Sequence, residues 1–147
     1  MKNIIIPDAS VILKWVFNSP EEINRDKALL LLEQWLNGDI EILLPGLWVF
    51  EVGNIVGLKS PDIAEDIMKI LIDYRFSEVT VSNDICKETF NLMKNYGVTF
   101  YDGVYHAVAI INRGIFVTAD EKYCKKLQTL KNVIPLDKYG LYSNRDV

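Results

Sequence analysis

Four acidic residues lie at positions from which their carboxylates could converge on one pocket. Asp8 and Asp120 each follow an apolar run that is typical of a strand. Because neighbouring parallel strands end at the same edge of a sheet, adjacent strands would bring these two carboxylates together. Glu51 and Asp102 lie in segments with helical periodicity, and each helix could add one carboxylate.

A pocket lined by several carboxylates can hold divalent cations, which activate a water molecule, neutralise a phosphodiester and stabilise the leaving oxygen. The net charge of −4 and the pI near 5.0 argue against a large basic surface for nucleic acid. If the substrate is RNA, bound cations must therefore offset the acidic site. With one histidine and two widely separated cysteines, Cys86 and Cys124, the chain favours oxygen-ligated Mg²⁺ or Mn²⁺ over zinc.

Three of the acids also have a structural interpretation. Asp8 could cap the helix that follows its strand. The spacings Thr99-x-x-Asp102 and Thr118-x-x-Glu121 both resemble capping boxes, the second within one residue of Asp120. For any one acid taken alone, this structural role is the simpler interpretation.

Glu51 is harder to explain by local structure. It interrupts an apolar segment, LWVFEVGNIV, in which an unpaired carboxylate would cost several kcal/mol. The sequence therefore predicts a metal ion or a paired cation beside Glu51. Asn54, three residues further on, shares its helical face.

Apolar runs alternate with helical periodicity along the whole chain, which predicts a mostly parallel sheet in a three-layer α/β/α fold. The length of 147 residues suits one domain, 1–147, with its own core. Helix starts are predicted at Ser19-Pro20 and Ser60-Pro61, where a hydroxyl precedes a proline. The predicted strands are 3–7, 40–44, 79–81, 115–118 and 132–134, and the predicted helices are 20–37, 45–57, 61–75, 83–96, 101–113 and 119–130.

The sequence has neither a transmembrane-length apolar stretch nor a leader-like N-terminus, so we expect a soluble, cytoplasmic protein that does not bind a membrane. Glycine-rich phosphate-binding motifs are also absent. The single histidine, His106, lies one helical turn after Asp102 and could hold its carboxylate. The more common role of such a histidine is to pack in the core with a hydrogen bond, and we favour that interpretation.

The motifs PDAS, PGLWVFEVGN, FYDGVYHAVAI and VTAD, in this order and spacing, resemble the PIN domain and, more narrowly, the VapC-type toxin ribonucleases. The resemblance extends from Asn3 to about Pro135. One departure is Gly103, where the family often has alanine. Because glycine is a poor helix former, Gly103 is expected to weaken the helix start by up to about 1 kcal/mol.

The resemblance implies a site and a reaction. The acids Asp8, Glu51, Asp102 and Asp120 would hold Mg²⁺ or Mn²⁺, with Asp8 and Asp102 as the most direct ligands. Polar neighbours of the family site match Ser10, Asn54 and Thr118. The implied activity is that of a metal-dependent endoribonuclease that hydrolyses RNA phosphodiester bonds.

The resemblance also implies partners. The protein would be the toxin of a type II toxin-antitoxin pair, restrained by a small antitoxin protein that blocks the acidic pocket, and would form a homodimer. Trp48 and its neighbours are expected to contribute to the dimer contact.

Two alternatives belong to other functional classes. One is a catalytically silent PIN-fold module that binds RNA or protein, which the presence of all four acids disfavours. The other is a receiver-like signalling domain that binds one Mg²⁺ through acids at strand ends. That alternative needs paired acids after the first strand, where PDAS supplies only Asp8.

Overall fold

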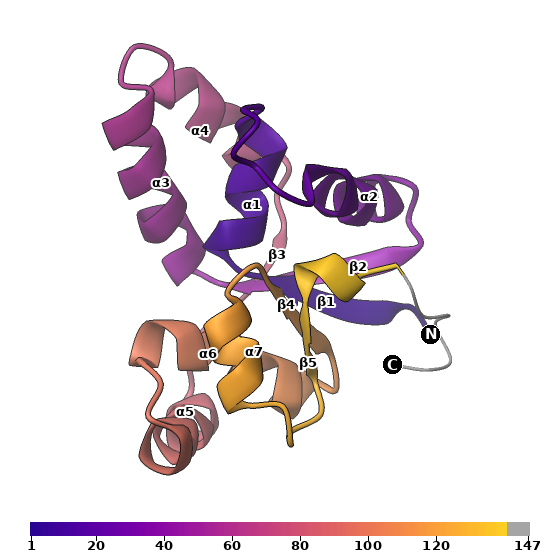
Figure 1. Cartoon of the computed structure of the whole chain (residues 1–147), viewed down its shortest axis with the longest axis vertical. Helices are drawn as coiled ribbons and strands as arrows, with labels where there is room; N and C mark the ends of the chain where they lie inside the picture. The colour runs from indigo at the N-terminus through magenta and orange to yellow at the C-terminus, as the bar shows by residue number, and fades with distance from the viewer. Residues whose placement is uncertain (141–147) are drawn as a thin grey trace.

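The computed structural model describes residues 1–140, which form a five-stranded sheet covered by helices (Figure 1). All strand pairings are parallel, and the spatial order is β3-β2-β1-β4-β5. The predicted three-layer α/β/α fold is confirmed. The strands are β1 (Asn3–Pro7), β2 (Ile40–Pro45), β3 (Ser77–Val79), β4 (Ile115–Thr118) and β5 (Val133–Pro135).

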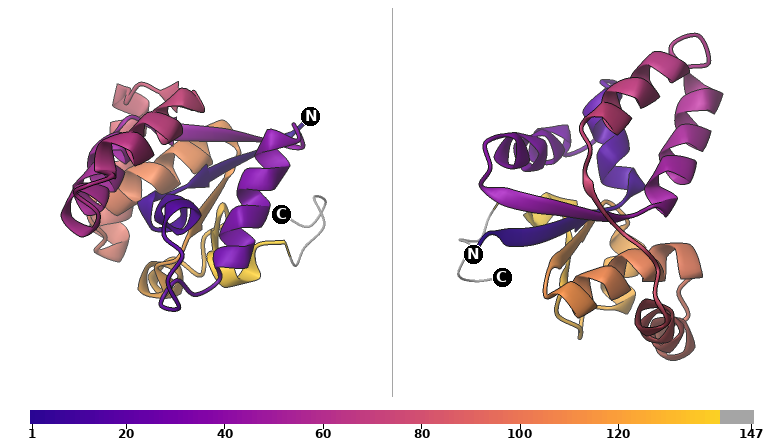
Figure 2. Two further views of the ribbon diagram at one scale, coloured as in Figure 1. Left: turned by 90° about the horizontal axis from the view of Figure 1, so that it is seen from above. Right: turned by 180° about the vertical axis from the view of Figure 1, so that it is seen from behind.

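Helices cover both faces of the sheet (Figures 1 and 2). One side carries α1 (Ala9–Val16), α2 (Arg25–Leu36), α3 (Leu47–Lys59) and α4 (Ala64–Asp73). The other side carries α5 (Asn83–Tyr96), α6 (Phe100–Asn112) and α7 (Glu121–Lys126), and a 3₁₀ turn, η1 (Leu136–Lys138), returns to α2. The pair α3 and α4 forms a hairpin that extends away from the sheet (Figure 2).

The order of the strands creates a crevice at the carboxyl ends of β1 and β4. The chain places β1, β2 and β3 in one direction across the sheet and then returns to place β4 on the free side of β1. The connections after β1 and β4 therefore leave towards opposite faces, an arrangement in which α/β proteins bind ligands. A receiver-like domain has the strand order 2-1-3-4-5, so the signalling alternative is wrong.

The core lies where the apolar strands meet the helices. Ile6, Leu44 and Val117 are fully buried in the three central strands. A second part of the core consists of Trp15, Trp35 and Trp48, whose rings surround Phe76 at centroid distances of 5.7, 4.7 and 5.9 Å. The tryptophans are thus core residues.

Trp48 corrects a prediction about the dimer contact. Only 2% of it is exposed, and its indole N–H donates to Oε1 of Glu78 at 2.7 Å. Its surface is used within one chain, so it is not available to a second copy. Its neighbour Phe50 is 76% exposed and is still free to contact a partner.

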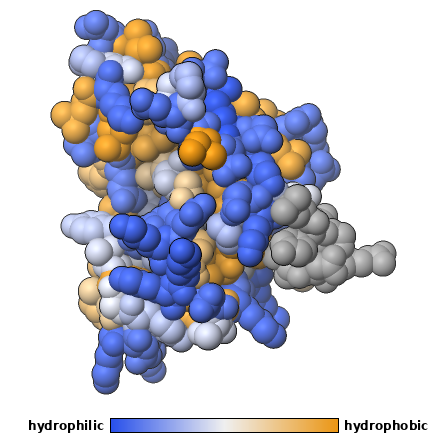
Figure 3. All heavy atoms as spheres, viewed as in Figure 1, coloured by the Kyte–Doolittle hydropathy of each residue, from blue (hydrophilic) through white to orange (hydrophobic). Residues whose placement is uncertain are grey.

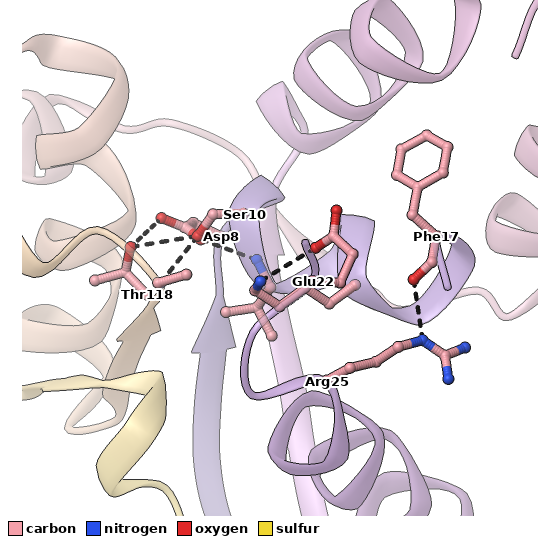
Figure 4. A network of polar contacts seen from close by, with 9 residues as sticks. Asp8, Ser10, Phe17, Glu22, Arg25 and Thr118 are labelled. Atoms are coloured by element: carbon pink, nitrogen blue, oxygen red, sulfur yellow. Dashed lines mark hydrogen bonds and ion pairs between the residues drawn. The ribbon is translucent and has the colours of Figure 1, made fainter. Parts of the chain in front are cut away.

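The helix boundaries differ most from prediction after α1. Residues 19–22 form a turn, closed by a bond from Glu22 N to Ser19 O at 3.0 Å, and α2 begins only at Arg25. Arg25 donates to the carbonyl of Phe17 at 3.0 Å, while Lys14 pairs with Glu22 at 3.1 Å (Figure 4). These side-chain contacts hold the connection as a turn, and so the predicted helix start at Ser19-Pro20 is wrong.

Three smaller differences occur elsewhere. Residues 61–63 form a turn before α4, so the helix predicted to start at Pro61 begins three residues later. The strand predicted at 79–81 lies two residues earlier, as β3. The helix predicted at 119–130 is confined to α7, which Asp120 caps. Within residues 1–140, no helix is long and apolar enough to cross a membrane.

Candidate active site

Asp8 lies at the carboxyl end of β1 and is 8% exposed. Its carboxylate caps α1 by accepting from the backbone N–H of Val11 at 3.4 Å. Its two oxygens also accept the hydroxyls of Ser10 and Thr118, the latter at 2.6 Å (Figure 4). Burial raises the pKa of Asp8 to about 6, against the lowering effect of these hydrogen bonds. Asp8 is therefore a buried carboxylate with hydrogen-bond donors around it, and within residues 1–140 no lysine or arginine forms an ion pair with it.

The hydroxyls of Ser10 and Thr118 are oriented by backbone groups. The oxygen of Ser10 accepts from the N–H of Ala119 at 3.0 Å, and that of Thr118 accepts from the N–H of Asp120 at 3.1 Å. Because an ionised carboxylate can only accept, both hydroxyls donate to Asp8. The register that pairs Pro7 with Val117 places β1 and β4 so that this network forms. Two of the three predicted polar neighbours, Ser10 and Thr118, thus contact Asp8.

Asp102 lies in the first turn of α6 and is half-buried. Thr99 caps the helix by accepting from the N–H of Asp102 at 3.2 Å, and a side-chain hydrogen bond with Thr99 lowers the pKa of the Asp102 carboxylate. Burial raises its pKa, and the charge of Asp120 raises it further. The charge of Asp102 in turn raises the pKa of both Asp8 and Glu51. Asp102 is the acid whose electrostatic field connects the other three.

Glu51 lies in α3 and is half-buried. Its Oε1 accepts the phenol O–H of Tyr105, in α6, at 2.7 Å. Burial raises the pKa of Glu51, as does the charge of Asp102, while the bond from Tyr105 lowers it. The sequence predicted a metal or a cation beside Glu51. The protein group that compensates its burial is instead a neutral hydroxyl.

Asp120 is the most exposed of the four acids and caps α7 by accepting from the N–H of Tyr123 at 3.1 Å. The capping interpretation is therefore correct for Asp8 and for Thr99-x-x-Asp102, but wrong for Thr118-x-x-Glu121, because Asp120 caps α7. Thr118 is not the cap of α7, because its hydroxyl is bound to Asp8. A helix cap and a site carboxylate can be the same residue.

Asn54 and His106, two further residues considered in the sequence analysis, lie in different surroundings: Asn54 is exposed and His106 is buried. Asn54 is exposed, and its side chain makes no hydrogen bond within residues 1–140. His106 is fully buried, with Nδ1 at 2.8 Å from the hydroxyl of Tyr123 and Nε2 at 3.3 Å from the carbonyl of Lys131. Burial lowers the pKa of His106. The core-packing interpretation of this histidine is confirmed.

Tyr105 is a residue of this region that the sequence analysis did not identify as part of the site. It is 1% exposed, and its ring stacks on Phe116 at 6.0 Å. Burial, the bond to Glu51 and the charges of Glu51, Asp8 and Asp102 all raise the pKa of its phenol. The available signal was its position three residues after Asp102, which places both side chains on one face of α6.

The donor chemistry suits a hard divalent cation. The four acids, Asp8, Glu51, Asp102 and Asp120, offer only oxygen atoms, which Mg²⁺ and Mn²⁺ prefer. Their mutual repulsion and the buried charge of Asp8 are unfavourable features that a cation would relieve. Within residues 1–140, no three acid, histidine or cysteine side chains already form a closed ligand set. The group fits a cation but would have to close around it.

A cleft of about 490 Å³ borders the acids on the side of Asp120. Lys14 and Lys122 line it, but so do several acidic residues, and Lys14 is paired with Glu22. The cleft is therefore not a basic groove, in keeping with the prediction that cations must offset the charge of an RNA substrate.

Comparison with known proteins identifies the family. The PIN domain model matches residues 5–127, and the chain therefore belongs to the PIN domain family. The predicted resemblance is confirmed. No curated protein sequence matches the chain significantly.

Several solved structures share the fold. A toxin-antitoxin complex from Klebsiella pneumoniae superimposes with a TM-score of 0.67 at 18% identity, covering 90% of this chain and 97% of the other. VapBC2 from Rickettsia felis, bound to a promoter DNA fragment, superimposes with a TM-score of 0.64 at 14% identity, covering 90% of this chain and 96% of the other. Mycobacterium tuberculosis VapC20, described as a sarcin-ricin loop cleaving toxin, superimposes with a TM-score of 0.59 at 12% identity, covering 78% of this chain and 87% of the other.

Proposed function

We propose that this PIN-domain protein is a metal-dependent endoribonuclease and the toxin of a type II toxin-antitoxin pair. The observation that supports the proposal is that four carboxylates from four segments of the chain interact electrostatically: the charge of Asp102 acts on Asp8 and Glu51, and that of Asp120 acts on Asp102. Asp8 is buried there without a cation, at an energetic cost that its hydrogen bonds only partly offset.

In this proposal each acid has a role that follows from its surroundings. Asp8 and Asp102 are the most direct ligands of Mg²⁺ or Mn²⁺, since one is fixed by Ser10 and Thr118 and the other interacts with all three remaining acids. Glu51 and Asp120 complete the set from the two sides. The cation, when bound, would activate water and neutralise the RNA phosphodiester.

Asp8 is ionised above about pH 6, so the site should bind a cation best above this pH. The ionised acids repel one another and leave the pocket strongly negative. The residues of the pocket therefore bind an RNA phosphate well only when a divalent cation offsets their charge. We propose that this requirement replaces the basic groove that the chain lacks.

Partners are also part of the proposal. One structural relative is described as a toxin-antitoxin complex, which supports a small antitoxin partner for this protein. An RNA substrate would place its action in the cytoplasm. A homodimer is supported by exposed apolar side chains on the α3–α4 hairpin, which forms the upper part of the molecule in Figure 3. Phe50 and Leu58, on α3, are 76% and 74% exposed, and Ile70, on α4, is 57% exposed.

The test is cleavage of a mixed RNA pool by purified protein with Mn²⁺ or with EDTA. We expect cutting only with Mn²⁺ and a decrease of about a hundredfold or more in Asp102→Asn, because a ligand of the cation is worth several kcal/mol. The matched control is Asp84→Asn, which makes the same change in the first turn of α5, on an exposed residue. Asp84→Asn should cut like the unchanged protein.

Two results would contradict the proposal. If Asp102→Asn cuts as fast as Asp84→Asn, the acids do not form the active site. If well-folded protein binds Mn²⁺ but cuts no RNA in the pool, the silent binding module becomes the better description.

A further inference from the structure

Glu51 depends on one side chain for its place among the acids. The helix that carries it, α3, packs mainly on α1, α4 and β2, whereas Asp102 lies on α6. Burial raises the pKa of Glu51, and the repulsive charge of Asp102 raises it further. Within residues 1–140, the only side-chain hydrogen bond to Glu51 is the one from Tyr105 at 2.7 Å.

Tyr105 is rigidly held where it meets Glu51. Its ring is stacked on Phe116 with an interplanar angle of 13°, and 1% of the residue is exposed. Since an ionised carboxylate can only accept, the phenol O–H is the donor. A fixed donor on α6 therefore determines where the flexible carboxylate from α3 comes to rest.

We propose that Tyr105 is a positioning residue of the acidic site: its hydroxyl holds Oε1 of Glu51 beside Asp102 and leaves Oε2 free to bind a divalent cation. This inference rests on the proposed function, because it assigns a task to one of the proposed ligands. Tyr105 itself touches neither the cation nor the RNA. Its effect on both passes through Glu51.

The hydroxyl of Tyr105 favours cation binding because it orients Glu51 in advance. Without it, the repulsion between Glu51 and Asp102 would turn the half-exposed glutamate towards water. A cation would then have to draw the side chain back and order it on binding, which weakens binding. Groups that orient a ligand in this way typically affect metal affinity or activity by 10–100-fold.

The experiment measures binding of Mn²⁺ alone, by electron paramagnetic resonance titration, to the full chain and to Tyr105→Phe. Phenylalanine keeps the stacked ring and removes only the hydroxyl, and water can reach the half-exposed Glu51, so the variant should fold. We expect the Kd for Mn²⁺ to rise about tenfold or more, with little change in the thermal unfolding midpoint in EDTA.

Tyr139→Phe is the matched control. Tyr139 is also buried, and its hydroxyl also donates to a side-chain oxygen, that of Gln34, but it lies next to α2 and away from the acids. It should bind Mn²⁺ like the unchanged protein. A loss of affinity in Tyr139→Phe equal to that in Tyr105→Phe would overturn the inference.

A double mutant shows whether Tyr105 acts through Glu51. In a Glu51→Gln background, Tyr105→Phe should change the Kd for Mn²⁺ by less than about threefold, because the residue it positions is no longer an ionised ligand. Equal effects of Tyr105→Phe in both backgrounds would overturn the inference, as would unchanged affinity in the single variant. Failure of the unchanged protein to bind Mn²⁺ would instead overturn the proposed function, and this inference with it.

Discussion

Asp8 and Glu51 contribute carboxylates to the same group of acids but are held there in different ways. Asp8 is 8% exposed and accepts hydrogen bonds from Ser10, Thr118 and the backbone of Val11. Glu51 is half-buried and has a single hydrogen bond, from Tyr105. One carboxylate is fixed from several directions, and the other is fixed from one.

The difference follows from the elements that carry the two acids. Asp8 ends a central strand, so the backbone pairing of β1 with β4 determines its position together with that of Thr118. Glu51 is carried by the α3–α4 hairpin, which extends from the sheet (Figure 2). The site thus combines a rigid side, formed by the sheet, with an adjustable side formed by helices. An adjustable side is what a group of acids needs if it must close around a cation.

The largest effect is expected on the rigid side. Thr118→Val keeps the shape of residue 118 but removes a donor from the buried Asp8 and an acceptor from the N–H of Asp120. We expect a loss of about 1–3 kcal/mol in the free energy of unfolding and a decrease of about 10–100-fold in Mn²⁺ affinity. Urea unfolding and Mn²⁺ titration measure the two quantities.

Thr89→Val is the control for that substitution. Thr89 is also fully buried, and its hydroxyl donates to the carbonyl of Ile85 at 2.7 Å within α5. It should cost no more than about 1 kcal/mol and should leave Mn²⁺ affinity unchanged. Equal results for the two valine variants would contradict the distinction between a rigid and an adjustable side.

A smaller effect is expected from pH. The pKa of Asp8 is about 6 in the folded protein, against 3.8 for an ordinary aspartate. The folded state therefore binds more protons between these values, and the contribution of Asp8 to stability is lost as pH rises through 6. In EDTA, this loss should be on the order of 1 kcal/mol between about pH 5 and about pH 7.5.

Comparison with Asp8→Asn isolates this contribution. The pKa of buried His106 is lowered, so its contribution to stability has the opposite slope and is lost as pH falls below 6.5. Both proteins carry His106, and its effect cancels in the difference between their unfolding free energies. A difference that does not change with pH would show that Asp8 is not a strained, buried acid.

The smallest effect is expected at the start of α6, the helix that carries Tyr105. A Cβ at Gly103 would lie 3.3 Å from Cγ2 of Thr89, a tight contact that a small shift can relieve. Gly103→Ala should therefore change stability by less than about 1 kcal/mol, because better helix propensity offsets the contact. Gly57→Ala, in α3, has open space and should gain up to about 1 kcal/mol.

Thermal unfolding of the two alanine variants measures the difference. If Gly103→Ala stabilises the protein as much as Gly57→Ala, the contact with Thr89 has no cost. If Gly103→Ala destabilises the protein strongly, the start of α6 cannot make the small shift that would relieve the contact with Thr89.

Most of the element order was predictable because it depends on strong local signals, although the predicted helices did not include α1 (Ala9–Val16). The buried central strands are continuous apolar runs, and β1 and β4 were predicted with their observed bounds. The start of α2 was not predictable in this way. Ser19-Pro20 is a good local helix start, but the contacts of Arg25 with Phe17 and of Lys14 with Glu22 stabilise a turn there instead.

The acids were predictable as a group, but their partners were not. The spacing of Asp8, Glu51, Asp102 and Asp120 relative to strand ends and helix starts indicated one site, and Ser10 was close enough in sequence to be expected beside Asp8. Within residues 1–140 the hydrogen-bond partner of Glu51 is the neutral hydroxyl of Tyr105 and not a lysine or arginine, and the sequence cannot show which buried donor will face it.

The sequence by itself determined the fold class and the family and indicated the four acids as one candidate site, because apolar periodicity and motif spacing are properties of the linear chain. Only the tertiary structure decided which polar groups meet. Thr118 reaches Asp8 across 110 positions, and Tyr105 reaches Glu51 across 54. Such hydrogen bonds form only when the donor and acceptor atoms come within roughly 3.5 Å in a suitable direction, so they depend on sheet register and helix packing.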